Sequence, residues 1–158
     1  MKEITLKGGS IAYVDDKDFE YLSKFKWCVS NRYASGTKDG KSFKMHREIL
    51  KDELTSNKLY VDHIDHNPLN NQRSNLRVCT NSQNQANRIK TERKTSSFKG
   101  VSWHNGANKW HARIYYNSRP LSLGLFNSEI SAAIAYDEKA LELFGEFALV
   151  NFPIEEAK

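Results

Sequence analysis

The sequence predicts an α+β protein of two small domains. Short stretches of alternating apolar and polar residues, separated by glycine and asparagine turns, predict several strands along the 158 residues. A hydrophilic stretch at residues 91–97 interrupts this pattern and is typical of a linker. Residues 91–119 hold six basic residues and one acidic residue, whereas residues 120–158 hold two basic and seven acidic residues. We therefore expect one domain over residues 1–90 and a second over 98–153 that has a cationic and an anionic face.

Composition and charge narrow the class of protein. With 39% hydrophobic and 27% charged residues the chain is typical of a folded globular protein, and its net charge of +5 favours a polyanionic partner. Cys28 and Cys79 form no CxxC pair, so neither a disulfide framework nor a zinc ribbon is predicted. The chain has no signal-peptide core and no apolar run of about 18 residues. We expect an intracellular, cytoplasmic protein without a membrane partner.

Residues 1–50 predict a β-rich N-terminal extension. A hairpin is expected over residues 4–14 with its turn at Gly8-Gly9, followed by a helix that opens near Asp15 and turns Phe19 and Leu22 to one side. The extension is completed by strands at 27–29 and 32–34, a loop at 36–40, a strand at 42–45 and a short helix at 46–50.

The segment at residues 58–90 has a different character. Strand-like runs lie at 59–61 and 77–80, and the polar stretch that follows predicts a helix with Asn81 as its N-cap. The expected order is therefore strand, loop, strand and helix.

The region after the linker predicts a three-stranded antiparallel sheet packed on one helix. Strands are expected at 98–103, 109–116 and 121–126, with turns at 105–106 and 117–120. Ser128 is placed to cap a helix that runs to Phe144, and Gly145 stands where a left-handed stop belongs. An apolar stripe is expected along this helix at Ile130, Ala133, Ile134, Leu141 and Phe144, and small residues for close approach to the sheet at Ala132, Ala133, Ala135 and Ala140.

The residues that carry chemistry lie in the run from Val61 to Asn71 and in three later asparagines. Hydrolysis of a phosphodiester needs an activated water, which a neutral imidazole can supply, and a centre that absorbs charge on the phosphate, which a cation held by oxygen ligands can supply. Asp62 and His63 are adjacent, so on a strand they would point to opposite faces, and only a strand end or a loop would let both serve one site. A helix from Asn81 can present Asn84 to the same place.

These residues resemble the HNH endonuclease family, especially its phage and intron-encoded homing enzymes. The resemblance covers Asp62 to Asn87, and it implies a ββα-metal nuclease module that binds one Mg²⁺ or Mn²⁺ ion and no small-molecule cofactor. It implies that Asp62 and Asn84 are metal ligands, that His63 is the general base, and that Asn75 fixes the loop and orients the histidine. It also implies that the protein acts in the host cell of a phage or mobile element.

Three further residues are possible accessories to this site. His46 lies in a His-Arg element often found ahead of the motif, and Asn87 is the last residue of the motif. His66 stands where the family often has glycine, so the loop must tolerate a histidine there, and this second imidazole could be mistaken for the base. The alternative for the whole segment is an asparagine-rich loop whose residues serve only turns and caps.

The second domain resembles the Apetala/ERF-type DNA-binding domain. The resemblance covers residues 97–153, including Phe98-Lys99-Gly100-Val101, Tyr136-Asp137 and Asn151-Phe152-Pro153. It implies that the sheet lies in the major groove of double-stranded DNA while the helix packs behind it. Several arginines of the plant pattern are missing, with Ser102 and Tyr115 at or near such positions, so the plant target site is not carried over. The candidate DNA contacts are Lys99, Ser102, Trp103, Lys109, Arg113, Tyr115 and Arg119, although Trp103 could equally belong to the core.

Together the two resemblances predict a metal-dependent DNA endonuclease that cuts or nicks at or near a site held by its C-terminal domain. Tethering raises the effective concentration of the nuclease at that site, and one active site per chain makes a nick the simpler outcome. The alternative is a sequence-specific DNA-binding regulator whose HNH module is an inactive scaffold. The target sequence and the oligomeric state do not follow from the sequence.

Overall fold

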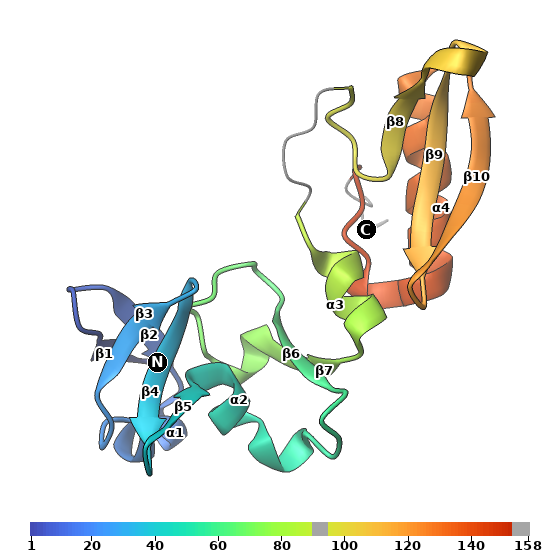
Figure 1. The fold of residues 1–158 in the computed structure, drawn as a ribbon. Helices are drawn as coiled ribbons and strands as arrows, with labels where there is room; N and C mark the ends of the chain where they lie inside the picture. The colour runs from blue at the N-terminus through green and yellow to red at the C-terminus, as the bar shows by residue number, and fades with distance from the viewer. Residues whose placement is uncertain (90–94, 153–158) are drawn as a thin grey trace, which may run out of the picture. The chain divides into compact units, whose positions relative to one another are not determined.

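The structure, a computed structural model, describes residues 1–89 and 95–152. The chain forms two compact units that meet in sequence between Asn81 and Ser82 (Figure 1). Small antiparallel sheets and several helices make up the described residues, so the predicted α+β class is confirmed. The predicted linker at 91–97 lies largely outside the described residues, and the domain limits of 1–90 and 98–153 stay predictions. No helix among the described residues is both long and apolar enough to cross a membrane.

The first unit begins with the predicted hairpin and helix. β1 (Lys2–Thr5) pairs antiparallel with β2 (Ile11–Val14), and Gly8 and Gly9 both adopt the positive φ that the reversal requires. α1 (Asp16–Leu22) follows and buries Leu22 against the hairpin core.

A three-stranded antiparallel sheet and a short helix come next. The sheet consists of β3 (Trp27–Ser30), β4 (Tyr33–Lys38) and β5 (Lys41–Lys44), and α2 (Met45–Ile49) follows it directly. The predicted loop at residues 36–40 is wrong in its first half, because Gly36 lies inside β4 and the chain turns only at Asp39-Gly40. The reason is packing: a Cβ on Gly36 would stand 3.1 Å from the Trp27 ring and 3.0 Å from the Phe43 ring. Glycine here accommodates two aromatic neighbours and does not mark a turn.

The predicted ββ ribbon is formed by β6 (Tyr60–His63) and β7 (Leu76–Cys79), with single 3-10 turns η1 (Lys51–Glu53) and η2 (Arg73–Asn75) ahead of each strand. Val61 and Leu76 of the ribbon are buried in the same core as Val14, Leu22 and Trp27 of the extension. The extension and the ribbon therefore fold as one body, and this fixes the ribbon against the N-terminal hairpin.

The second unit contains most of α3 (Asn81–Asn87) and the predicted sheet and helix. The strands β8 (Val101–His104), β9 (Lys109–Tyr116) and β10 (Arg119–Phe126) run antiparallel in the order β10-β9-β8, and α4 (Glu129–Phe144) packs on one face. Single turns η3 (Asn105–Ala107) and η4 (Gly145–Phe147) complete it. β10 begins two residues earlier than predicted, since Asn117 and Ser118 alone make the turn with positive φ. Pro120 is tolerated because β10 is an edge strand.

The helix α4 buries only part of the predicted apolar stripe. Ile130 and Ile134 are 55% and 45% exposed, so the predicted stripe is wrong at both positions. The predicted small residues Ala132, Ala133 and Ala140 do face the sheet, because small side chains let the helix axis approach the strands closely. At the helix start Ser128 accepts the bond of the Ser131 N–H as predicted. Gly145 ends the helix with φ 52° and ψ −126°, which is a glycine region but not the expected left-handed helical one.

A polar clasp closes the second unit around buried Asp137. The Asp137 carboxylate accepts bonds from the backbone N–H groups of Asn151 and Phe152 at 2.8–2.9 Å and from the Asn151 side chain. The Asn151 side chain also bonds both backbone groups of Lys99, ahead of β8. The C-terminal segment is thereby tied to the start of the sheet.

Candidate active site

The N-terminal extension holds the loop between β6 and β7. The Tyr13 N–H donates to Leu69 O at 2.9 Å, and the Asn71 N–H donates to Tyr13 O at 2.7 Å. The loop therefore pairs with β2 through backbone hydrogen bonds on both sides of Asn70. Asp18 of α1 accepts two bonds from the Arg73 guanidinium at 2.8 and 2.9 Å. These bonds make the extension a support for the loop.

Asn75 closes the loop from inside. Its Nδ2 donates to Asp65 Oδ1 and to Asn70 O, both at 2.8 Å, and its Oδ1 accepts the bond of the Asp65 N–H at 3.0 Å. Partial burial raises the pKa of Asp65, but hydrogen bonds from Asn70, the Asn67 N–H and Asn75 more than offset this and leave that pKa lowered. One buried amide thus ties both ends of the loop together.

His63 is the last residue of β6 and its side chain is buried. Its Nε2 lies 3.4 Å from Oδ1 of Asn71, a residue with 0% exposure. Burial lowers the pKa of His63, against the opposing influence of Asn71 and of the charges of Asp65 and Asp62. The imidazole is therefore neutral at neutral pH, which is the form that can accept a proton.

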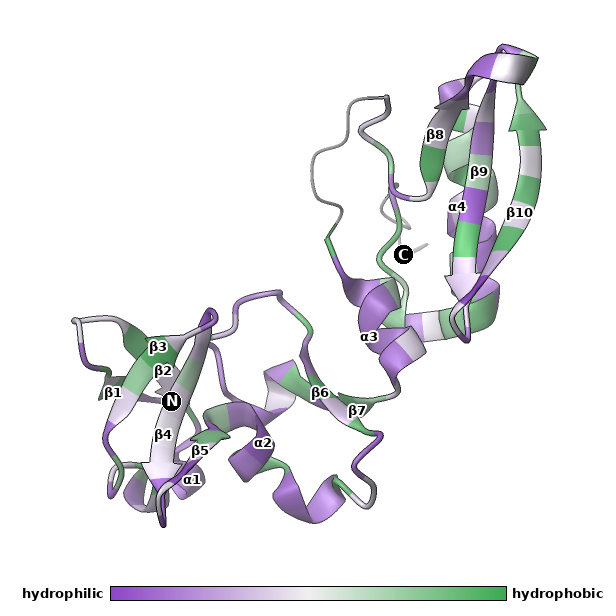
Figure 2. Cartoon of the chain, in the orientation of Figure 1, coloured by the Kyte–Doolittle hydropathy of each residue, from purple (hydrophilic) through white to green (hydrophobic). Residues whose placement is uncertain are grey.

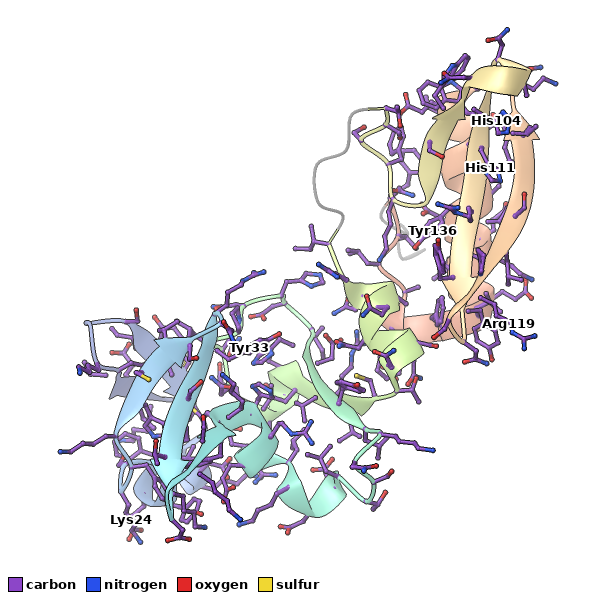
Figure 3. All side chains as sticks on the ribbon, in the orientation of Figure 1. Lys24, Tyr33, His104, His111, Arg119 and Tyr136 are labelled. Atoms are coloured by element: carbon purple, nitrogen blue, oxygen red, sulfur yellow. The ribbon has the colours of Figure 1, made fainter. Side chains whose placement is uncertain are left out.

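Two other rings pack against His63. The ring of His46 in α2 meets it edge to face, with centroids 5.1 Å apart and an interplanar angle of 77°. Tyr33, the first residue of β4 (labelled in Figure 3), contacts both rings, with centroids 4.9 Å from His46 and 5.9 Å from His63. Burial lowers the pKa of His46 to about 3, and its Nδ1 is buried without a hydrogen-bond partner among the described residues. Such a nitrogen costs on the order of 1–3 kcal/mol of stability.

Asp62 lies on the opposite face of the ribbon from His63, as alternation along a strand requires. Its Oδ2 accepts bonds from Nε and Nη2 of Arg77, the residue directly across on β7, at 3.1 and 3.0 Å. Burial, together with the Asp62 charge, raises the pKa of the Cys79 thiol to about 12. Asp62 and His63 both lie at the end of β6, which is the position expected from the sequence if they serve one site.

Asn84 and Asn87 lie on α3, within the second unit. The predicted metal site joins Asp62 of the first unit to Asn84 of the second, and this pairing stays a prediction. Among the described residues no group of three or more His, Cys, Asp or Glu side chains is placed to hold a metal. Carboxylate and amide oxygens are nevertheless ligands that suit Mg²⁺, which keeps water and substrate oxygens as its other ligands.

His66 has a backbone conformation that glycine adopts more easily, which fits the glycine expected at this position from the resemblance. Its φ of 61° places it in the left-handed region, and its N–H closes a turn onto His63 O at 3.1 Å. A histidine there costs on the order of 1 kcal/mol relative to glycine. Its half-buried ring belongs to the turn, whereas that of His63 belongs to the buried cluster.

In the second unit the sheet face away from α4 is polar. By alternation along β9, Ala112 and Ile114 point to α4 and are buried, while Lys109, Arg113 and Tyr115 share the other face. Figure 2 shows this alternation as purple and green bands along β9. Ser102 joins them from β8, since it pairs with His111. Four of the seven candidate DNA contacts therefore lie on one face.

The remaining three candidates are placed differently. Trp103 pairs with Trp110 on the α4 side and packs on its ring with centroids 5.0 Å apart, although it stays 38% exposed. The Lys99 ammonium donates to Ala86 O of α3, and burial lowers its pKa to about 8, which counts against it as a phosphate contact. Arg119 is exposed at the start of β10, next to the turn.

Sequence reasoning missed several residues at these sites. Asn71, Tyr33 and Arg77 surround His63 and Asp62; Asn71 and Arg77 stand inside the motif but were given no role, whereas Tyr33 carried no signal. On the sheet, His104 and His111 (labelled in Figure 3) lie on the polar face, with His111 Nε2 2.8 Å from Ser122 Oγ. The period of two along residues 109, 111, 113 and 115 would have identified His111.

Comparison with known proteins agrees with this geometry. The HNH endonuclease family profile matches residues 55–86, which span the ribbon, the loop and most of α3. Over 147 residues the chain is 35% identical to an uncharacterized HNH endonuclease of Acanthamoeba polyphaga mimivirus, covering 90% of this chain and 75% of that protein. The chain therefore belongs to the HNH endonuclease family.

Two shorter similarities cover only part of the chain. Protein 3.8 of Escherichia phage T7 is 38% identical over 55 residues, which is 35% of this chain and 46% of that protein. An ethylene-responsive transcription factor of Arabidopsis thaliana is 39% identical over 64 residues, which is 39% of this chain and 15% of that protein.

Proposed function

We propose that this nuclease is a metal-dependent DNA endonuclease that cuts at or near a site bound by its second unit. The observation that carries the proposal is a buried, neutral His63 at the end of β6, next to Asp62 and held by Asn71. An imidazole in this state is a competent base, and a group buried at such cost is expected to serve chemistry.

His63 is proposed to take the proton of the attacking water. A bond in which Nε2–H donates to the Asn71 oxygen selects the tautomer whose Nδ1 is the basic nitrogen. Asn75 keeps the adjoining loop in one conformation, so that the imidazole and the substrate meet in a fixed geometry.

Asp62 and Asn84 would hold a divalent ion, Mg²⁺ or Mn²⁺. When bound, the ion supplies positive charge for the phosphate and for the leaving oxygen. The ion pair with Arg77 orients the Asp62 carboxylate in the ribbon, where it would act as an oxygen ligand.

The second unit is proposed to be an Apetala/ERF-type domain that binds double-stranded DNA through its polar sheet face. The partial similarity to plant ethylene-responsive transcription factors supports this, as do the cationic side chains of Lys109 and Arg113 on that face. Changing either residue to alanine should weaken binding and lower the slope of log affinity against log salt by roughly one. The viral and phage relatives support a homing-type enzyme of a phage or mobile element.

The test is incubation of supercoiled DNA carrying candidate sites with the full chain, in Mg²⁺, in Mn²⁺ and in EDTA. We expect metal-dependent nicked or linear product, a loss of about 10²–10⁴-fold in His63→Ala, and a comparable loss in Asp62→Ala. Both variants should still bind DNA. Asp52→Ala, which removes an exposed carboxylate of the same unit, is the matched control. Salt-sensitive, sequence-specific binding without any cleavage would instead identify a DNA-binding regulator with an inactive HNH scaffold.

A further inference from the structure

A three-ring cluster surrounds the proposed base and is drawn from three separate elements. His63 ends β6, His46 lies in α2, and Tyr33 begins β4. Each ring contacts the other two, at centroid separations of 4.9, 5.1 and 5.9 Å. The elements are far apart in sequence, so only the fold brings these rings together.

The cluster is not explained by packing for stability alone. His46 buries Nδ1 without a hydrogen-bond partner among the described residues, where an apolar side chain would fill the space without that penalty. Tyr33 remains 37% exposed, and its ring packs against the rings of two histidines and not against the apolar core. The two-residue hairpin turn that leads into Tyr33 places Asn31 and Arg32 at φ 50° and 75°; asparagine is common in such turns, whereas arginine rarely adopts this conformation. Strain and an unpaired buried nitrogen in one place point to a functional constraint.

Tyr33 is itself held from its outer side. The ammonium of Lys44 lies 5.9 Å from the centre of the Tyr33 ring, and it donates to Ser30 O and to Ser35 Oγ at 3.0 and 2.6 Å. These bonds fix Lys44 to the same sheet. The tyrosine ring therefore has a defined position against the histidines.

We propose that Tyr33 and His46 are positioning residues that fix the ring plane of His63. This inference rests on the proposed role of His63 as the base. The contact between His63 Nε2 and Asn71 Oδ1 spans 3.4 Å, at the long end of hydrogen-bond distances, so packing of neighbouring rings can add to the orientation of the imidazole. His46 on edge and Tyr33 across a tilted face restrict rotation of the imidazole by van der Waals contact. The basic nitrogen then stays aimed at the attacking water.

The test uses Tyr33→Leu, which removes the ring, and Tyr33→Phe, which keeps it and removes only the hydroxyl. We expect Tyr33→Leu to lower the single-turnover cleavage rate on the order of 10- to 100-fold with little change in DNA affinity, because misorientation of a base affects the chemical step. Tyr33→Phe should stay close to the wild-type rate. His46→Leu, which keeps the site apolar and removes the second ring, should also lower the rate.

A second readout needs neither metal nor DNA. In the full-length protein, the ring protons of His63 should show NMR chemical shifts displaced by the two neighbouring rings, and the displacement should shrink in Tyr33→Leu but persist in Tyr33→Phe. If Tyr33→Leu leaves both the His63 shifts and the cleavage rate unchanged, the positioning role is wrong. If the His63 chemical shifts change in Tyr33→Leu, but wild-type protein and His63→Ala cleave at the same rate, then the assignment of His63 as the base is wrong. Loss of rate in Tyr33→Phe equal to that in Tyr33→Leu would also overturn the proposal, since it would assign the effect to the hydroxyl.

Discussion

The two units keep their polar residues in opposite environments. In the first unit a cluster of polar groups is buried: His46, Asp62, His63, Asn71 and Asn75. In the second unit the polar sheet face is open to solvent, and the buried carboxylate Asp137 is fully occupied by the clasp to Asn151. A reaction requires groups that are desolvated and held in one geometry, whereas a binding face must meet its partner without rearrangement. The comparison separates the buried groups of the proposed active site from the open face of the proposed DNA-binding surface.

The largest effect is expected from Gly100→Ala, which should destabilise the second unit and leave the first unit folded. Gly100 has φ 77°, and a Cβ there would stand 1.9 Å from Cδ2 of buried Tyr136. We expect a loss of more than about 4 kcal/mol and an unfolded sheet, seen as collapse of the second unit's amide signals in a ¹H–¹⁵N spectrum while those of β6 and β7 persist. Gly106→Ala, whose Cβ would come no closer than 3.5 Å to the His104 ring, is the control. A native spectrum for Gly100→Ala would contradict the close packing described.

Asn75→Ala tests whether the buried polar groups of the first unit act as structure. It removes three hydrogen bonds and leaves the Asp65 and Asn70 partners unsatisfied. The expected loss is about 2–4 kcal/mol, measured by hydrogen exchange at the β6 and β7 amides. The control is Asn67→Ala, an exposed residue of the same loop. Unchanged exchange in Asn75→Ala would mean that the loop is held by the extension alone.

Acidification sharpens the contrast between the units. His46 is neutral in the fold with a pKa of about 3, whereas in the unfolded chain its pKa lies near 6.5. Between these values the unfolded state binds more protons, so stability present above pH 6.5 is lost as the pH falls towards 3. His46 contributes up to about 1.4 kcal/mol per pH unit in that window. Thermal unfolding of the first unit at pH 4–7 should show a smaller slope in His46→Leu than in wild type, and equal slopes would refute the burial of a neutral imidazole.

His66→Gly should have the smallest effect. Relief of the left-handed backbone at φ 61° is expected to raise the stability of the first unit by no more than about 1 kcal/mol. Cleavage should be unchanged, because the proposed base is His63. A large drop in the cleavage rate would identify His66 as the base and reverse the assignment.

Local pattern predicts most of the elements, but not every residue that they bury. The N-terminal hairpin, the ββ ribbon and the three-stranded sheet with its helix all follow from alternation, turn residues and Ser128 as a cap. The apolar pattern predicts Ile130 and Ile134 in the core, but both are exposed, whereas the predicted alanines do pack on the sheet. Glycine predicts a loop at Gly36, but two aromatic rings require it inside β4. Both errors come from neighbours that are distant in sequence.

The sequence by itself determined three features, because each depends only on residue type and short spacing. They are the adjacent pair Asp62 and His63, the asparagines of the loop that follows, and the charge difference between residues 91–119 and 120–158. The tertiary structure alone decided that β2 and α1 hold the loop, that Arg77 pairs with Asp62 across the ribbon, and that Tyr33 and His46 close around His63. These contacts join residues between 15 and 58 positions apart. Spacing along the chain carries no signal for such pairs, because they depend on how buried elements pack in one core.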